Sequence, residues 1–168
     1  MATKIRFSFS SESINNAIKQ LEDYKRSFSY KNELFVERCA ALGISVINTK
    51  VNQSLGDSDK NVSCTADFDR MGAITKASIV VNGKDIVFIE FGAGSYYNDE
   101  NHPKSNEFGF TIGSYGKGQG INPGYWYYTK DGQSHQLSVG TQATMPIYNA
   151  SLEIIKQVRQ IAIEVFGG

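Results

Sequence analysis

Within the first fifty residues, the spacing of apolar positions changes from every second residue to every third or fourth residue. Residues 5–9 alternate apolar and polar side chains, which predicts a strand with one buried face. After the serines at 10–13, which suit a helix N-terminus, apolar residues recur every three or four positions. This spacing predicts a short amphipathic helix within residues 10–24 and a second helix at about residues 32–47. The apolar positions of the two helices are Ile14, Ala17, Ile18, Leu21 and Tyr24, then Phe35, Cys39, Leu42 and Val46.

The middle of the chain has the alternation that is typical of strands. A polar loop is predicted at residues 52–60, and a half-buried strand follows at residues 62–69. Residues 77–83 then form an apolar strand pattern that ends in Asn-Gly, the dipeptide that favours a type I′ hairpin turn. We therefore expect residues 86–91 to return as a strand. Because this run is apolar on both faces, it should lie centrally in the sheet.

A second hairpin and a long helix are predicted near the end of the chain. The aromatic run at residues 125–128 leads to Asp-Gly and then to the alternating residues 135–139. After Pro146, apolar residues follow one helical face almost to residue 168. Together the patterns predict one α+β domain spanning residues 1–168. Its mostly antiparallel sheet would carry two N-terminal helices and one long C-terminal helix packed on it.

Residues 92–124 form a polar, glycine-rich segment much longer than the usual connection of about four to six residues. Only residues 108–112 have the pattern of a strand. The segment also carries aromatic side chains at Tyr96, Tyr97 and Tyr115, which are uncommon in chains that stay unfolded. We expect it to order against a partner.

Composition limits the classes of partner. A length of 168 residues suits a single core, and lysine plus arginine balance aspartate plus glutamate at 17 each. That balance argues against a protein that grips phosphate backbones, and no sequence-specific nucleic-acid contact is expected. No run is long and apolar enough for a membrane span, and the first residues do not resemble a signal peptide, so we expect a cytosolic protein. Cys39 and Cys64 are interpreted as buried apolar residues.

Catalytic and cofactor motifs do not emerge from the sequence. The glycines at 116–124 have neither the Walker spacing nor the dinucleotide-binding fingerprint that opens a helix. His102 and His135 lie in different segments without the spacing of metal ligands. No serine or cysteine occupies a nucleophile elbow. We therefore expect no catalytic residue, no metal and no cofactor.

Two features allow other interpretations. Glu90 lies in the apolar run 86–91, where a carboxylate needs a partner. It is expected to pair with a lysine, an arginine or a backbone group, and less readily to act as the acid of a hydrolase. The aromatic strand 125–128 offers side chains to both faces of a sheet. Such rings anchor protein interfaces, and they equally suit a cytosolic module that holds carbohydrate or single-stranded nucleic acid.

Residues 88–94, with the sequence FIEFGAG, resemble the (V/I)-E-F-G-(T/A)-G strand end of the phage tail-completion or neck family. Three further segments match this family in the same order. They are Asn-His-Pro at 101–103 with the glycine-rich run 113–120, the aromatic strand around Trp126, and residues 140–150, GTQATMPIYNA, which open the last helix.

The resemblance implies a small α+β structural protein without enzymatic activity, which forms rings or multimers at the head–tail junction of a tailed bacteriophage. Its implied partners are copies of itself, portal or head-completion proteins, and tail-tube or tail-terminator proteins, with DNA passing through the ring. It would reside in the virion and, during assembly, in the host cytoplasm. Residues 47–52 lack the Pro-x-x-Thr-Gly-x-Leu segment that many members carry after the second helix.

We therefore expect assembly contacts in place of a catalytic site. The candidates for these contacts are Glu90, Phe91, Gly92, Gly94, Tyr96, Tyr97, Tyr115, Trp126, Met145, Pro146 and Tyr148.

Overall fold

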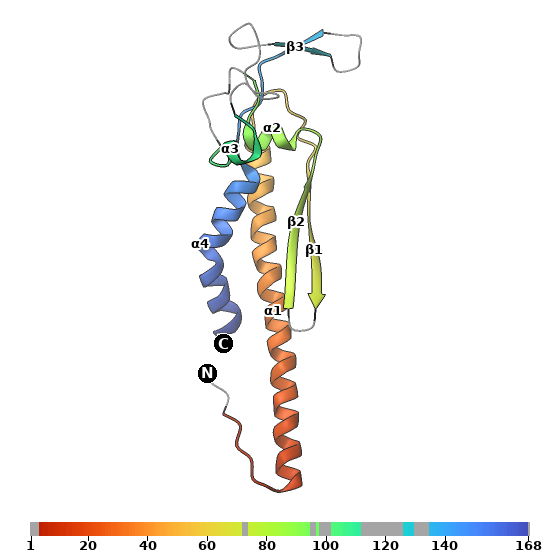
Figure 1. The fold of residues 1–168 in the computed structure, drawn as a ribbon, viewed down its shortest axis with the longest axis vertical. Helices are drawn as coiled ribbons and strands as arrows, with labels where there is room; N and C mark the ends of the chain where they lie inside the picture. The colour runs from red at the N-terminus through yellow and green to blue at the C-terminus, as the bar shows by residue number, and fades with distance from the viewer. Residues whose placement is uncertain are drawn as a thin grey trace.

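The molecule is built along one long helix. A computed structural model describes residues 4–71, 74–94, 97, 102–111, 126–129 and 135–167. At residues 126–129, 135 and 136 it describes the backbone only. Helix α1, Ser11–Gln53, has 43 residues and is therefore about 65 Å long at 1.5 Å per residue. Helix α4, Pro146–Phe166, lies along one side of its C-terminal half, and a hairpin lies along another (Figure 1). The N-terminal half of α1 extends beyond both (Figure 1).

Helix α1 replaces the two N-terminal helices that the sequence predicted. It begins at Ser10, whose side chain accepts a hydrogen bond from the Ser13 backbone N–H. Neither proline nor glycine occurs between residues 24 and 32, and Phe28 continues the apolar stripe, so nothing interrupts the helix. The predicted strand at residues 5–9 was wrong as well. The alternating residues there lie outside any strand, since no described strand pairs with them, and Phe9 is 98% exposed.

The first hairpin consists of β1, Ser63–Met71, and β2, Ile74–Asn82, which pair antiparallel from Ser63↔Asn82 to Met71↔Ile74. The predicted strand at 62–69 is thus confirmed, but the predicted hairpin through Asn-Gly at 82–83 was wrong. Its returning segment is helix α2, Ile86–Phe91. A short apolar run fits a buried helix as well as a strand, and β2 was already paired with the strand before it.

The remaining elements are short. The strand predicted at 108–112 was wrong for its described residues, since Phe108 ends helix α3, Ser105–Phe108, and residues 109–111 belong to no strand. Helix α3 ends at Gly109, which has the left-handed conformation; residue 112 lies outside the described residues. Strands β3, Trp126–Thr129, and β4, His135–Ser138, pair antiparallel as predicted. Within the described residues the strands form two separate two-stranded sheets, so the single helix-covered sheet of the prediction is replaced by a helix-centred α+β fold.

The core lies where α1, α2, α4 and the first hairpin meet. Its fully buried residues are Ile47, Val51, Ile89 and Ala150, with Val46, Val62, Cys64, Ile79, Val81 and Ile86 packed against them. The interpretation of both cysteines as apolar side chains is borne out in part. Cys39 and Cys64 are free and half-buried, and burial raises the pKa of both thiols.

At Gly43 helix α1 lies close to both β2 and α4. A Cβ at this position would lie 2.5 Å from Ile79 Cδ1 of β2 and 2.9 Å from Ile154 Cδ1 of α4. We expect Gly43→Leu to lower the free energy of unfolding by about 1–3 kcal/mol, because the added side chain must push both isoleucines out of their packing. Urea unfolding followed by circular dichroism measures this. Ala41→Leu, on the exposed side of the same helix, is the control and should change little.

Candidate functional site

Glu90 holds the start of α4. Its side chain is buried, and its two carboxylate oxygens accept the backbone N–H groups of Ile147 at 2.7 Å and of Tyr148 at 2.9 Å. These N–H groups belong to the first turn of α4, where no carbonyl of the helix is available to them, and the helix dipole favours a negative charge. The prediction that Glu90 pairs with a backbone group is confirmed, although the residue lies on a helix and not on a strand.

His102 completes the arrangement. Its Nε2 lies 3.0 Å from Glu90 Oε1, and its Nδ1 accepts the Lys104 backbone N–H at 3.0 Å. With Nδ1 used as an acceptor, the proton of the neutral ring lies on Nε2, which donates it to the carboxylate. The imidazole and the Glu90 side chain are both almost fully buried. The pair therefore ties the segment after residue 101 to the start of α4.

An aromatic cluster covers this pair. The Phe91 ring stacks on Phe110 with centroids 4.4 Å apart, and it also contacts His102 at 4.5 Å and Phe108 at 5.9 Å. The Tyr148 ring meets His102 edge-on at 5.1 Å. Phe91 and Tyr148, both candidates from the sequence, thus both contact the imidazole.

Backbone hydrogen bonds also connect the segment around Glu90 to the segment that precedes α4. Ala93 and Thr141 exchange both backbone hydrogen bonds at 2.9 Å, and the Ile89 carbonyl accepts the Thr144 N–H at 3.0 Å. Residues 88–94 and 140–150, which carry most of the family resemblance, are therefore in direct contact. Asp57 supports the junction, because its Oδ2 accepts hydrogen bonds from Ser138 Oγ at 2.8 Å and from the Val139 N–H at 2.7 Å.

The candidate residues divide into two groups. Most of those around the junction are buried or half-buried, with Gly92 at φ 77° and Met145 at φ 52° making its turns. These residues therefore stabilise the fold and present little surface to a partner protein. Tyr97 is half-buried. Tyr96 and Tyr115 lie outside the described residues, and of Trp126 only the place in β3 is described.

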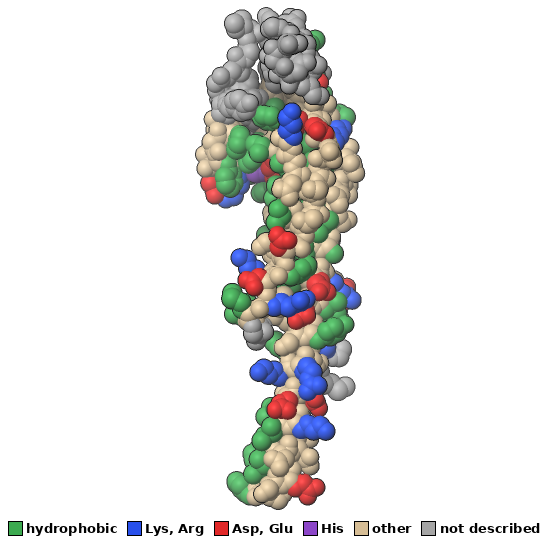
Figure 2. Space-filling view, turned by 90° about the vertical axis from the view of Figure 1, so that its right-hand side faces the viewer, with side chains coloured by type: hydrophobic (Ala, Val, Ile, Leu, Met, Phe, Trp, Pro, Cys, Tyr) green, Lys and Arg blue, Asp and Glu red, His purple; other side chains and the backbone are tan. Residues whose placement is uncertain are grey.

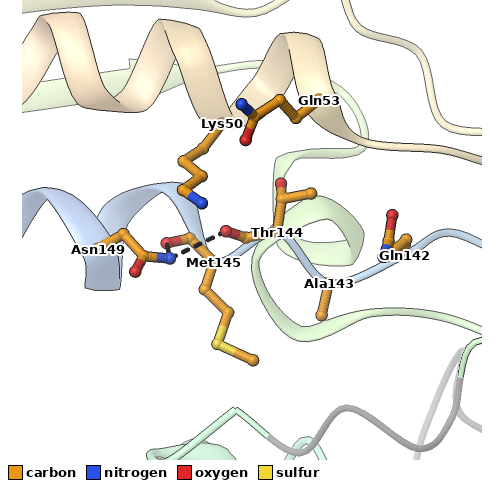
Figure 3. A pocket seen from close by; sticks show the side chains of 7 residues that line it. All are labelled: Lys50, Gln53, Gln142, Ala143, Thr144, Met145 and Asn149. Carbon is orange, nitrogen blue, oxygen red and sulfur yellow. Dashed lines mark hydrogen bonds between the residues drawn. The ribbon is translucent and has the colours of Figure 1, made fainter.

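A polar pocket of about 380 Å³ lies beside the junction (Figure 3). It is lined by Lys50 and Gln53 from the end of α1 and by Gln142, Ala143, Thr144, Met145 and Asn149. The Asn149 amide donates to the carbonyls of Thr144 at 3.0 Å and Met145 at 2.8 Å, which holds one wall in place. The described residues of its lining include amide side chains and one lysine, and neither a carboxylate nor a histidine is among these described residues.

An apolar surface remains open along the two long helices. On the projecting half of α1 it consists of Ile14, Ile18, Leu21, Tyr24 and Phe28, which we call the α1 stripe; each is 39–56% exposed. Figure 2 shows hydrophobic side chains gathered along one edge of this part of the helix. The stripe reaches α4, because the rings of Phe28 and Phe166 lie 6.0 Å apart.

Helix α4 carries an open apolar surface of its own. Leu152, Ile155 and Ile163, which we call the α4 stripe, are 46%, 69% and 55% exposed. They lie on the side of the helix away from the buried Ala150 and Ile161. The sequence predicted Ile14, Ile18, Leu21 and Tyr24 as the apolar face of an amphipathic helix, and in the structure these side chains remain 39–56% exposed.

Comparison with known protein families, curated proteins and solved structures found no match. Among the described residues, no group of three or more histidine, cysteine, aspartate or glutamate side chains is placed to hold a metal ion. None of the described helices has the length and apolar character needed to cross a membrane.

Proposed function

We propose that this chain is a non-enzymatic structural subunit of a tailed bacteriophage, which assembles with copies of itself and with neighbouring proteins at the head–tail junction. The observation that carries the proposal is the open apolar surface of the α1 stripe and the α4 stripe. A continuous apolar patch larger than a few hundred Å² on a folded protein usually marks an interaction site. A rod that leaves half of an amphipathic helix uncovered fits a subunit that is completed by its neighbours.

The junction around Glu90 supports the same role. It unites the two segments that carry most of the resemblance to tail-completion and neck proteins, residues 88–94 and 140–150. A subunit of a ring needs a rigid joint between its elements, because the angle between neighbours sets the number of copies. The buried pair of Glu90 and His102 supplies such a joint at one end of the rod. The neighbours proposed from the resemblance are portal or head-completion proteins and tail-tube or tail-terminator proteins.

A substitution that places a charge on the α1 stripe tests the proposal. We expect Leu21→Glu to leave the fold intact, because Leu21 is 56% exposed, but to remove the chain from tailed particles. The reason is that a glutamate buried in an apolar contact loses its hydration without gaining a partner. Tailed particles are purified from a culture whose resident prophage carries the variant, and an antibody detects the chain.

The control for this experiment is Asn16→Glu. It adds the same single charge on the opposite, exposed face of α1 and should leave incorporation unchanged. Infectious particles that contain Leu21→Glu at the wild-type level would show that the α1 stripe has no part in assembly.

A further inference from the structure

We infer that residues 4–9 of one copy, which we call the N-terminal arm, pair as an antiparallel strand with the open edge of β1 in a second copy. This inference rests on the proposed self-assembly and names a contact that joins two copies. The arm lies outside any helix or strand, and Phe7 and Phe9 are 63% and 98% exposed. Its alternation of apolar and polar residues is that of a strand with one buried face. The arm therefore has the pattern of a strand, but none of the described strands pairs with it.

Strand β1 offers the edge that the arm needs. Among the described strands β1 pairs with β2 alone, and β2 lies between β1 and α1 in Figure 1. The pairing runs without a bulge from Ser63 to Met71, and β1 contains no proline. The outer edge of a long, regular strand presents unpaired backbone N–H and C=O groups, which accept an added strand.

The two faces of β1 differ in the same way as the two faces of the arm. One face of β1 is turned towards α1, because Cys64 packs against the core and Arg70 forms an ion pair with Glu33. The opposite face is exposed and carries Asp67 and Asp69. The arm likewise has apolar side chains on one face and two cations on the other.

One antiparallel register matches both faces at once. The arm carries two cations two positions apart, and β1 carries two aspartates two positions apart, so a single antiparallel register places each cation opposite an aspartate. The same register places each apolar residue of the arm opposite an apolar residue on the α1-facing side of β1. Opposite charges and apolar side chains in directly opposed positions stabilise a pair of strands. The six pairs are Lys4–Asp69, Ile5–Phe68, Arg6–Asp67, Phe7–Ala66, Ser8–Thr65 and Phe9–Cys64.

The charges favour the arm over a second copy of β1 as the added strand. In the part of the chain that the structure describes, none of Lys4, Arg6, Asp67 and Asp69 forms an ion pair. Symmetric antiparallel pairing of two β1 strands about residues 67–69 brings aspartates of both copies together, and like charges directly opposite each other destabilise a sheet. The cationic arm neutralises these aspartates instead.

The arm cannot reach this position in its own chain. Phe9 adjoins Ser10, the N-cap of α1, whereas Cys64 packs against the core cluster that contains Ile47. Residues 10 and 47 of a continuous helix lie about 55 Å apart at 1.5 Å per residue. The β1 edge must therefore belong to a second copy. Because the arm and the β1 edge are different surfaces, the contact can repeat from copy to copy and close a ring.

Disulfide cross-linking of the full-length chain tests the register. The variant Phe9→Cys is made together with Cys39→Ala, so that its thiol can react with Cys64 of a second copy. Opposed residues of an antiparallel pair have Cα atoms about 4.5–5.5 Å apart, which lies within the range that a disulfide spans. After mild oxidation, electrophoresis without reductant should show dimers and higher multimers, and reduction should return them to the monomer.

Two controls show whether the link joins the arm to β1 in this register. Ser8→Cys, also made with Cys39→Ala, turns its thiol to the other face of the strand and should cross-link at least about 10-fold less. Adding Cys64→Ala to the Phe9→Cys variant removes the partner thiol and should abolish the multimers.

A charge exchange tests the proposed ion pairs in the same assay. Arg6→Asp, added to the Phe9→Cys variant, places a carboxylate opposite Asp67 and should slow cross-linking about 10-fold. Adding Asp67→Arg to that chain restores the pair with its charges exchanged, and it should restore the rate.

The inference is overturned if Phe9→Cys stays monomeric, if either control cross-links as well as Phe9→Cys does, or if the charge exchange does not restore the rate. The assay uses the purified chain without particles. A negative result for a chain that is still found between head and tail therefore rejects the arm contact alone.

Discussion

Replacing Glu90 by alanine should lower the free energy of unfolding by about 3–5 kcal/mol, a large part of the 5–15 kcal/mol that holds a typical domain. The change removes the acceptor of three hydrogen bonds, from the N–H groups of Ile147 and Tyr148 and from His102 Nε2. The His102 donor would then be buried without a partner, at about 1–3 kcal/mol, and the two part-buried N–H groups would lose their acceptor. The midpoint of urea unfolding, followed by circular dichroism, measures the loss.

Two further variants identify the cause of this loss. Glu90→Gln keeps one oxygen but turns an amide N–H towards a backbone donor, so its unfolding midpoint should lie between those of wild type and Glu90→Ala. Glu107→Ala removes a glutamate that pairs with Lys104 at the surface, and its midpoint should equal that of wild type. If Glu90→Ala unfolded at the wild-type urea concentration, the carboxylate would not be what holds the start of α4.

Gly140→Ala should prevent cooperative folding. Gly140 has φ 99°, which an L-residue rarely adopts, and an added Cβ would fall on the backbone carbonyl of Ala93. Ala93 is hydrogen-bonded to Thr141 and cannot move away without opening the junction. We expect a loss of more than about 3 kcal/mol, seen as insoluble protein or as the absence of a sharp urea transition.

Gly109→Ala separates strain from steric conflict. Gly109 has φ 75°, also in the left-handed region, but a Cβ there would meet nothing within 4 Å. It should therefore cost only about 1 kcal/mol from the backbone conformation. Equal losses for the two alanine variants would show that φ alone matters and that the segments 88–94 and 140–150 are not in close contact.

The sequence correctly predicted the elements that are specified by the pattern of residues within their own segment. Apolar and polar residues alternate in β1 from Ser63 to Phe68, and α4 has a proline at its start and an apolar face. Residues 86–91 were assigned to a strand because a short apolar run has the same pattern in a buried helix and in a strand. The two helices expected before residue 50 are one, because polar residues on an exposed helical turn resemble a loop in sequence.

The site was predictable only in part. The need of Glu90 for a partner follows from its apolar neighbours, whereas the contact between residues 88–94 and 140–150 was not predicted. His102 was considered as a metal ligand and as part of the Asn-His-Pro segment at 101–103, and nothing local in the sequence indicates that it contacts Glu90 twelve positions earlier. The open surface depends on where α4 ends along α1. That position is set by the packing of the two helices, and the spacing of apolar residues in the sequence does not predict it.

Electron cryomicroscopy of tailed particles, released by inducing a resident prophage, tests the proposed role most directly. We expect a ring of density between head and tail into which copies of the α1 rod fit, with the α1 stripe of each copy against its neighbour. Particles with complete head–tail junctions built from other proteins, and with this chain absent by mass spectrometry, would contradict it.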